Sequence, residues 1–194
     1  ITESAVRVAG RDHEVDALVL SPAGLFLVEI KSRPGVLRGD AHSWTWTTDG
    51  RTFTYDNPLI LANRKAKRLA SLLRRQPAIT KAKGKLPFVE PAIFLSSSSL
   101  ACQLEGLAKS ATYQLGRPGS LDDPGIVGAL SNGITSRTST PVDAIQARAI
   151  GRGVIEAGIR PSNKHRQIGD YKLTKLIAEG DGFQDWEASH VSVD

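Results

Sequence analysis

The chain has 194 residues, of which 40% are hydrophobic and 23% are charged, and this composition is typical of a folded globular protein. Its length allows one or two domains. No apolar run approaches the roughly 20 residues that cross a bilayer, which excludes a membrane-spanning class. The single Cys102 excludes an internal disulfide and favours the reducing cytoplasm. Because Met and any signal-peptide pattern are absent, we expect a piece of a longer cytoplasmic protein.

Positive charge is concentrated in one segment, residues 51–85. This segment holds ten Lys or Arg and one acid, Asp56, so it carries +9 while the rest of the chain carries −4. Such a basic block predicts a polyanionic partner, most simply nucleic acid. A solvated helix face would give part of the same pattern without any partner.

The first hairpin is predicted from two short hydrophobic strands at residues 14–20 and 25–31. Between them, Ser21-Pro22-Ala23-Gly24 favours a tight turn, with Pro at its second position and Gly at its fourth. If the turn is symmetric about its two central residues, cross-strand partners have numbers that sum to 45.

This register would place the polar residues of the hairpin on one face, with Asp16 opposite Glu29 and Glu14 opposite Lys31. Carboxylates on directly opposed residues, with Cβ atoms about 5 Å apart, repel each other unless a cation or a proton intervenes. Oxygen ligands of this kind favour Mg²⁺ or Mn²⁺. Because the other face is apolar, we expect the polar face to lie open to a cleft or solvent. The alternative is a surface ion pair between Glu14 and Lys31, with both other carboxylates exposed beside it.

A second hairpin and a basic helix follow. The hairpin is predicted from residues 42–48 and 51–55, joined by Asp49-Gly50. Its two tryptophans, Trp44 and Trp46, are expected to pack in the core and at its rim, with base-stacking platforms as the alternative. The helix is predicted to be capped by Asp56 or Asn57, to have Pro58 in its first turn and to end near Gln76, before Pro77. Its buried stripe would be Leu59, Ala62, Ala66, Leu69 and Leu73. Its outward basic residues, which could contact DNA phosphates or simply face solvent, are Arg64, Lys65, Lys67 and Arg68.

The remaining segments are predicted from composition and periodicity. In chain order we expect a basic loop at 78–87, strands at 88–95 and 111–116, a short helix at 122–130, a helix capped by Thr140 that ends near Gly158, and strands within 168–194 around Gly180-Asp181-Gly182.

The first hundred residues resemble the nuclease-related domain (NERD), a branch of the PD-(D/E)xK nuclease superfamily. The resemblance rests on segments 15–20 and Gly24–Lys31, on Gly35 and Trp44, and on Asn57-Pro58. Its core signature is an Asp, twelve residues, then Glu-x-Lys. The resemblance implies an α/β (α+β) fold, in which a mixed β-sheet flanked by helices forms a restriction-endonuclease-like core.

The resemblance also implies a metal-dependent endonuclease that acts on DNA and uses Mg²⁺ or Mn²⁺. Asp16 and Glu29 would be metal ligands together with the carbonyl of Ile30, and Lys31 would complete the catalytic set. We expect Lys31 to orient the phosphate and stabilise the transition state, because neighbouring carboxylates favour its charged form. Two features depart from the family. Leu61 stands where a Gln is usual, and no helix is expected before the first strands.

The end of the chain carries a second resemblance, to the first strand and glycine-rich loop of a protein kinase. It covers residues 168–173 and 176–183, with Asp185 in place of the third glycine. No later kinase motif follows, so kinase activity and ATP binding are expected only of a full-length protein. The order of parts resembles the PglW-type NERD kinases of Pgl/BREX phage defence. The predicted domains are a nuclease-like domain at 1–120, a mainly helical linker at 121–165, and a β-rich start of a kinase N-lobe at 166–194.

Three functions are therefore open. The first is a DNA endonuclease within a phage-defence Ser/Thr kinase, which could have other defence proteins as partners but no membrane partner. The second is a catalytically degenerate nucleic-acid-binding or regulatory module that controls the adjoining kinase. The third is an assembly domain that neither binds nor cleaves DNA.

Overall fold

The computed structural model describes residues 6–7, 14–82, 85–116, 125–132, 141–161, 167–168, 171–180 and 183–190. The chain separates into two compact units, with the division after Arg160. The domain boundaries expected at residues 120 and 165 stay predictions.

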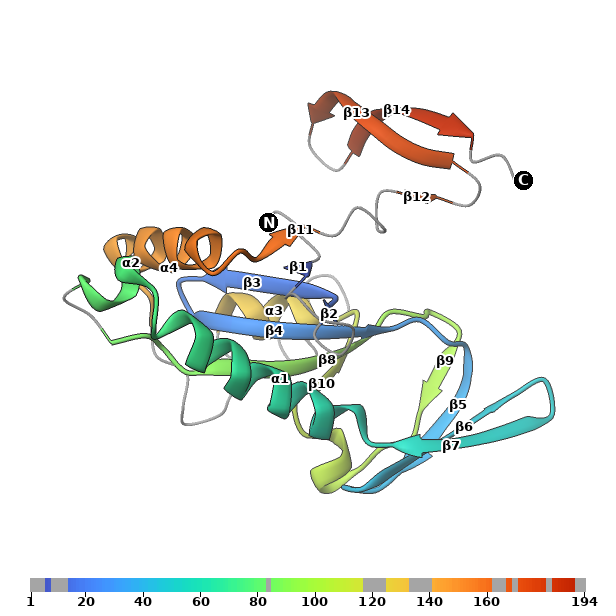
Figure 1. The fold of residues 1–194 in the computed structure, drawn as a ribbon. Helices are drawn as coiled ribbons and strands as arrows, with labels where there is room; N and C mark the ends of the chain where they lie inside the picture. The colour runs from blue at the N-terminus through green and yellow to red at the C-terminus, as the bar shows by residue number, and fades with distance from the viewer. Residues whose placement is uncertain are drawn as a thin grey trace. The chain divides into compact units, whose positions relative to one another are not determined.

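A four-stranded mixed sheet in the order β10-β8-β4-β3 forms the centre of the first unit (Figure 1). Strand β4 (Gly24–Lys31) runs parallel to β8 (Val89–Leu95), which runs parallel to β10 (Thr112–Gln114). Strand β3 (Ala17–Ser21) is antiparallel to β4 in the predicted register. The mixed sheet flanked by helices confirms the predicted fold class.

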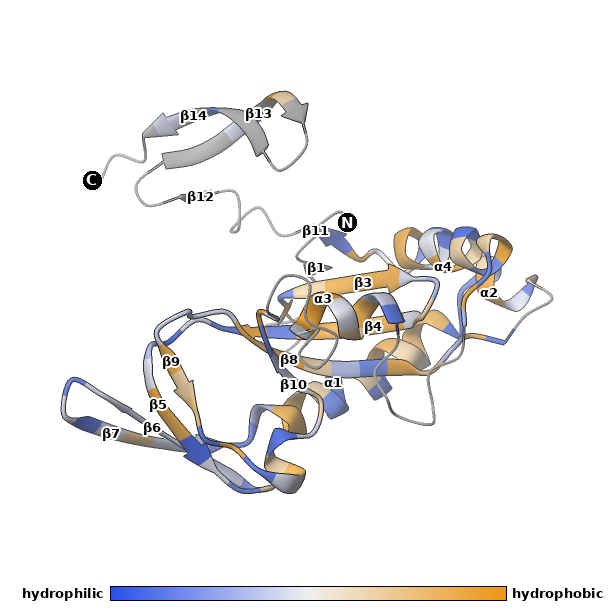
Figure 2. Ribbon diagram, turned by 180° about the vertical axis from the view of Figure 1, so that it is seen from behind, coloured by the Kyte–Doolittle hydropathy of each residue, from blue (hydrophilic) through white to orange (hydrophobic). Residues whose placement is uncertain are grey.

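Helices cover both faces of this sheet. Helix α1 (Pro58–Leu73) packs on β8 and β4, and α3 (Gly125–Asn132) packs on β3 and β10. Leu25 and Leu27 of β4 belong to the core shared with α1, whereas Phe26 and Val28 belong to a second core on the other face. Burial on both faces explains why this strand is an almost continuous apolar run. The hydrophobic colours of Figure 2 follow the neighbouring strand β3 as well.

A second four-stranded sheet has the order β7-β6-β5-β9. Its strands are β5 (Gly35–Gly39), β6 (Ser43–Thr48), β7 (Arg51–Asp56) and β9 (Leu100–Cys102). The β6–β7 hairpin confirms the prediction, and both turn residues, Asp49 and Gly50, have the positive φ that such a turn requires. Trp44 and Trp46 are buried, as expected.

Gly35 makes the passage from the central sheet into β5. Its φ is +106°, and a Cβ there would lie 2.2 Å from the carbonyl oxygen of Thr47. Only a residue without a side chain fits this close approach of two backbones. Strands β5 and β9 were not predicted, because both are short. Strand β9 also pairs in parallel with β5, which lies far earlier in the sequence.

The helices differ from expectation at their ends. Helix α1 ends at Leu73, and a short helix α2 (Pro77–Thr80) occupies the start of the predicted loop, since Pro is tolerated in a first turn. Helix α4 (Ala144–Glu156) is capped by Asp143, whereas the predicted cap, Thr140, lies outside the described residues. The Asp143 carboxylate accepts from the backbone of Gln146, whose side chain accepts from the Asp143 N–H, so this reciprocal capping box fixes the later start. A one-turn 3₁₀ helix, η1, spans Gly106–Lys109.

The remaining strands are short or lie near the chain's end. A three-stranded sheet has the order β11-β1-β2 and consists of β1 (Val6–Arg7), β2 (Glu14–Val15) and β11 (Arg160–Pro161). The second unit contains β12 (Gln167–Ile168), β13 (Tyr171–Gly180) and β14 (Phe183–His190), all antiparallel. These strands confirm the prediction for this segment, although Asp181-Gly182 lies outside the described residues. Among the described helices, none is long and apolar enough to cross a membrane.

Candidate active site

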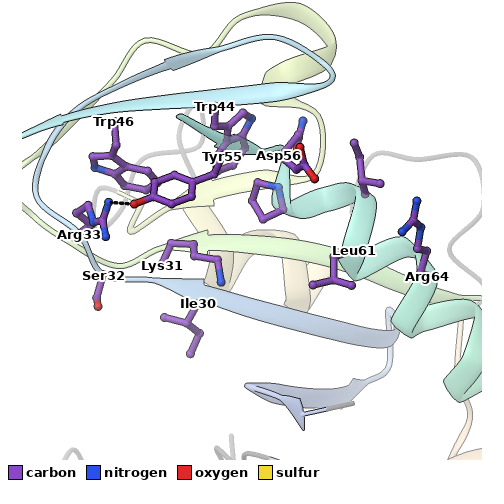
Figure 3. A pocket seen from close by; sticks show the side chains of 13 residues that line it. Ile30, Lys31, Ser32, Arg33, Trp44, Trp46, Tyr55, Asp56, Leu61 and Arg64 are labelled. Carbon is purple, nitrogen blue, oxygen red and sulfur yellow. Dashed lines mark hydrogen bonds between the residues drawn. The ribbon is translucent and has the colours of Figure 1, made fainter. Parts of the chain in front are cut away.

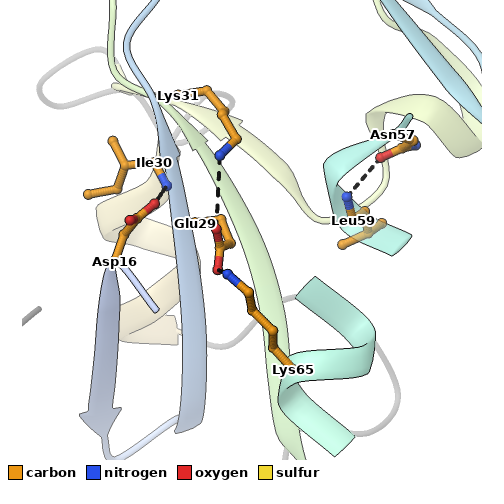
Figure 4. Close-up of polar contacts among 7 residues, drawn as sticks. All are labelled: Asp16, Glu29, Ile30, Lys31, Asn57, Leu59 and Lys65. Carbon is orange, nitrogen blue, oxygen red and sulfur yellow. Dashed lines mark hydrogen bonds and ion pairs between the residues drawn. The ribbon is translucent and has the colours of Figure 1, made fainter. Parts of the chain in front are cut away.

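Glu29 is a buried carboxylate near the end of β4, on the face of the strand that α1 covers. Its exposed fraction is 6%. Its Oε1 accepts a hydrogen bond from Nζ of Lys65 on α1 at 2.6 Å, and its Oε2 lies 3.9 Å from Nζ of Lys31 (Figure 4). The expectation that this polar face lies open is therefore wrong for Glu29, because α1 packs over it.

Asp16 lies at a bend between β2 and β3, where the ladder with β4 has ended. The last pair of that ladder is Ala17 with Val28, so the predicted pairing of Asp16 with Glu29 is not formed. Instead, Oδ2 of Asp16 accepts a hydrogen bond from the backbone N–H of Ile30 at 2.7 Å. The side chain thus takes the place of a strand carbonyl and lies beside β4.

The predicted pairing of Glu14 with Lys31 is wrong. The backbone of Glu14 pairs with Arg7 of β1, because the ladder with β4 ends before the bend at Asp16. Lys31 instead lies at the edge of a cavity, with 37% of its side chain exposed.

Burial raises the pKa of Glu29 above its ordinary value of 4.5. The hydrogen bond and the charge of Lys65 offset part of this rise, while the charge of Asp16 adds to it. The two carboxylates therefore repel each other electrostatically, although they are not ladder partners. A cation between them would relieve this repulsion.

The donor set at this site suits a hard divalent cation. Asp16 and Glu29 offer carboxylate oxygens, and Mg²⁺ is commonly held by one or two carboxylates with water and substrate phosphate completing the shell. Within the described part of the chain no three His, Cys, Asp or Glu side chains gather as a metal cluster. A metal here would therefore depend on these two carboxylates, on the Ile30 carbonyl and on ligands from outside the protein. It would also compete with the Lys65 ammonium for Glu29.

The four basic residues predicted to bind nucleic acid divide into two kinds. Arg64, Lys67 and Arg68 are exposed on α1, as a phosphate-binding surface requires. Lys65 has only 12% of its side chain exposed and is turned towards Glu29. Its spacing was a usable signal, since Lys65 lies three residues after Ala62 and four before Leu69, which places it beside the buried stripe.

A cavity of about 890 Å³ adjoins this carboxylate site (Figure 3). The end of β4, the aromatic side of the β6–β7 hairpin and the first turns of α1 form its walls. Leu61, at the position where the family usually carries Gln, is 52% exposed and lines it. Its other lining residues are Ile30, Lys31, Ser32, Arg33, Trp44, Trp46, Tyr55, Asp56, Asn57, Pro58, Ile60 and Arg64.

Asn57 joins two walls of this cavity. Its Oδ1 accepts from the backbone N–H of Leu59 at 2.9 Å and so caps α1. Its Nδ2 donates to the carbonyls of Asp40 and Ala41 at 3.3 and 3.2 Å, and its backbone N–H donates to His42. The side chain is almost fully buried, so each of these bonds is shielded from water.

Comparison with known proteins agrees with this arrangement. The nuclease-related domain family, NERD, matches residues 2–96. The chain carries a NERD domain. This domain contains Asp16, Glu29, Ile30, Lys31 and the whole of α1, so every residue of the carboxylate site lies within the family match.

One relative is the probable kinase PglW of Streptomyces coelicolor, which is 32% identical over 183 residues. The match covers 93% of this chain, so it extends well beyond the NERD domain, but the chain spans only 11% of the length of that relative. No solved structure matches the chain.

Proposed function

We propose that the NERD domain of this chain is a metal-dependent endonuclease module that acts on DNA phosphodiester bonds. The observation that carries the proposal is a buried carboxylate, Glu29, held at the end of β4 beside Asp16 and next to Lys31 at the mouth of a cavity. Placing a buried carboxylate close to a second carboxylate is unfavourable, so the pair is better explained by chemistry than by stability.

Asp16, Glu29 and the Ile30 carbonyl would hold Mg²⁺ or Mn²⁺, which would supply an activated water and neutralise charge on the phosphate. Lys31 would remain an ammonium group. From the cavity edge it can donate to a non-bridging phosphate oxygen and stabilise the negative charge that develops there. The Ile30 N–H fixes the orientation of Asp16 through the 2.7 Å hydrogen bond.

Arg64, Lys67 and Arg68 support the choice of DNA as the substrate class. All three are exposed on α1, and Arg64 also lines the cavity. Cations in this position can contact phosphates on either side of the cleaved bond and hold a strand over Lys31 without reading its sequence. This role does not extend to Lys65, which is engaged with Glu29.

A supercoiled-plasmid cleavage assay with Mg²⁺ or Mn²⁺ tests the proposal. We expect nicking by the chain, none after Lys31→Ala or Glu29→Gln, and unchanged nicking after Lys109→Ala, which removes an exposed lysine on η1. Metal-independent nicking, or nicking that survives both site substitutions, would show a contaminating or different activity. DNA binding without nicking at any metal concentration would reject the enzyme.

A second candidate function is a nucleic-acid-binding regulatory module for an adjoining kinase in phage defence. The Lys65–Glu29 pair favours it, because an internal ammonium already compensates the buried carboxylate without a metal. The likeness to a probable kinase supports this second function. In it the module would belong to a longer cytoplasmic protein, in which ATP would bind beyond this chain and other defence proteins could bind too. Calorimetric titration separates the two functions. Mn²⁺ binding that Glu29→Gln abolishes supports the nuclease, and no Mn²⁺ binding supports the regulatory module.

A further inference from the structure

The β6–β7 hairpin carries four aromatic rings on one face. Trp44 pairs across the strands with Tyr55, and Trp46 pairs with Phe53, so all four side chains point the same way. The two tryptophans are buried at 1% and 5% exposure and form the base of the layer. Phe53 and Tyr55 are 39% and 48% exposed, and their rings stack at 6.5 Å with an angle of 20° between the planes.

Arg33 holds the two exposed rings in place. Its guanidinium carbon lies 5.3 Å from the centre of the Phe53 ring and 5.4 Å from that of Tyr55, and its Nη1 donates to the Tyr55 hydroxyl at 3.0 Å. Such cation–π contacts fix flat rings that would otherwise rotate freely. Ordering exposed aromatic rings in advance reduces the entropy that a stacking ligand would lose on binding.

Positively charged side chains lie near the stacked rings of Phe53 and Tyr55 and could bind the phosphates of a nucleic-acid strand. Lys31, Arg33 and Arg64 line the same cavity as Tyr55, with Asp56 the only acid among the lining residues. Figure 3 shows Tyr55 and Arg33 on one side of the cavity, Lys31 below the Tyr55 ring and Arg64 on the α1 side. A ligand that matches this wall has a flat ring at one end and negative charge along the rest, which describes a nucleotide.

We propose that Tyr55, which lines the cavity, and Phe53, which stacks on Tyr55 outside the lining, form a stacking subsite for an unpaired base of a DNA strand whose phosphates lie along Lys31 and Arg64. This rests on the proposed function, since it names the strand form that the same cleft receives. A base within a duplex is already stacked on its neighbours and cannot present its face to Tyr55. The chain should therefore prefer single-stranded or locally unpaired DNA to a perfect duplex.

Fluorescence anisotropy with the whole chain tests the subsite in EDTA, so that no cleavage or metal binding is needed. The probes are a labelled thymidine oligonucleotide and a blunt duplex of equal charge. Tyr55→Ala is expected to weaken single-strand binding about 5- to 100-fold and duplex binding far less, since one base–aromatic contact is lost. Phe88→Ala is the matched control, because Phe88 is a similarly exposed ring, 45% exposed, outside the cavity.

Two further readouts keep the result interpretable. Tyr55→Phe retains the ring and should keep most of the single-strand affinity, which a general loss of folding would not allow. A fluorescent adenine analogue within the oligonucleotide should be quenched on binding and should regain its emission with Tyr55→Ala. Equal losses on single strand and duplex, or no loss with Tyr55→Ala and Phe53→Ala, would overturn the subsite. Single-strand preference without plasmid nicking would leave the subsite standing and reject the nuclease, whereas nicking without the preference would do the reverse.

Discussion

The ammonium of Lys65 donates a 2.6 Å hydrogen bond to the carboxylate of Glu29 and thereby links α1 to the end of β4. Both side chains are largely buried, at 12% and 8% exposure. The pair therefore has a structural and a chemical consequence. It compensates a charge inside the core, and it occupies the carboxylate that a metal ion would use.

Removing Lys65 should destabilise the protein strongly. Lys65→Ala leaves a buried carboxylate without its main cationic partner, and we expect the free energy of unfolding to fall by about 3 kcal/mol. Lys67→Ala, which removes an exposed lysine from the same helix, should change it by less than about 0.5 kcal/mol. Urea denaturation measures both. Combining Lys65→Met with Glu29→Gln should recover most of the loss, and an equal loss in Lys65→Ala and Lys67→Ala would contradict a buried pair.

Stability should depend on pH through Glu29. Because burial raises the pKa of Glu29 in the folded protein above 4.5, the folded state holds this proton more tightly than the unfolded state. Protonation of Glu29 therefore stabilises the folded state. This stabilisation is complete at pH values below the pKa of Glu29 in the unfolded chain, and it is lost as the pH rises through the pKa of Glu29 in the folded protein. The wild type should thus lose stability relative to Glu29→Gln as the pH rises from 4.5 towards neutrality. Denaturation of both proteins across this range measures the difference, and a change in the opposite direction would refute it.

Asp16 can be tested by separating its hydrogen bond from its charge. Asp16→Asn keeps an oxygen that can accept from the Ile30 N–H, so stability should change little. Asp16→Ala removes the acceptor from a partly buried N–H and should lower stability by about 1 to 2 kcal/mol. Both substitutions should weaken Mn²⁺ binding by at least about tenfold. A neutral amide is a poorer ligand for a hard cation than a carboxylate, and alanine offers no ligand. Thermal denaturation and calorimetry give the two readings. Full Mn²⁺ affinity in Asp16→Asn would assign Asp16 a structural role alone.

The exposed basic residues of α1 predict the salt dependence of DNA binding. If Arg64, Lys67 and Arg68 each contact one phosphate, replacing all three with Ala should reduce the slope of log affinity against log salt by about 2 to 3. A matched control replaces Arg74, Arg75 and Lys81, which are also exposed and carry the same total charge. Filter binding over a range of salt concentrations measures the slopes. Equal reductions in both variants would indicate a general charge effect and no defined DNA surface.

The local pairing around the site could be predicted, because a symmetric turn fixes its register. The expected register holds from Ala17 with Val28 to Ser21 with Gly24. The register fails at Asp16, where the chain bends. The bend could not be predicted, because the alternation of polar and apolar residues continues through Asp16. The proximity of Asp16 and Glu29 survives that failure, because the Asp16 side chain bonds the residue next to Glu29.

The spacing of Lys65 beside the buried stripe indicates that it faces the sheet, but its contact with Glu29 could not be predicted from the strand pattern. It depends on how α1 rotates and how close it lies to β4, and these are set by the packing of Ala62 and Ala66 against the sheet. Small alanine side chains allow the helix to approach closely, so Lys65 reaches the strand. The stacked pair of Phe53 and Tyr55 was missed for a similar reason, because Arg33 comes to it from a segment twenty residues away in the sequence.

The hydrogen bonds of Asn57 give the cavity a mechanical property. One side chain fastens the start of α1 to the turn before β6, so the helix wall and the hairpin wall cannot separate without breaking buried bonds. We therefore expect no hinge closure of these two walls around a ligand. Its width is fixed before binding, so the cavity selects ligands by size, and any conformational change on binding must occur in the ligand.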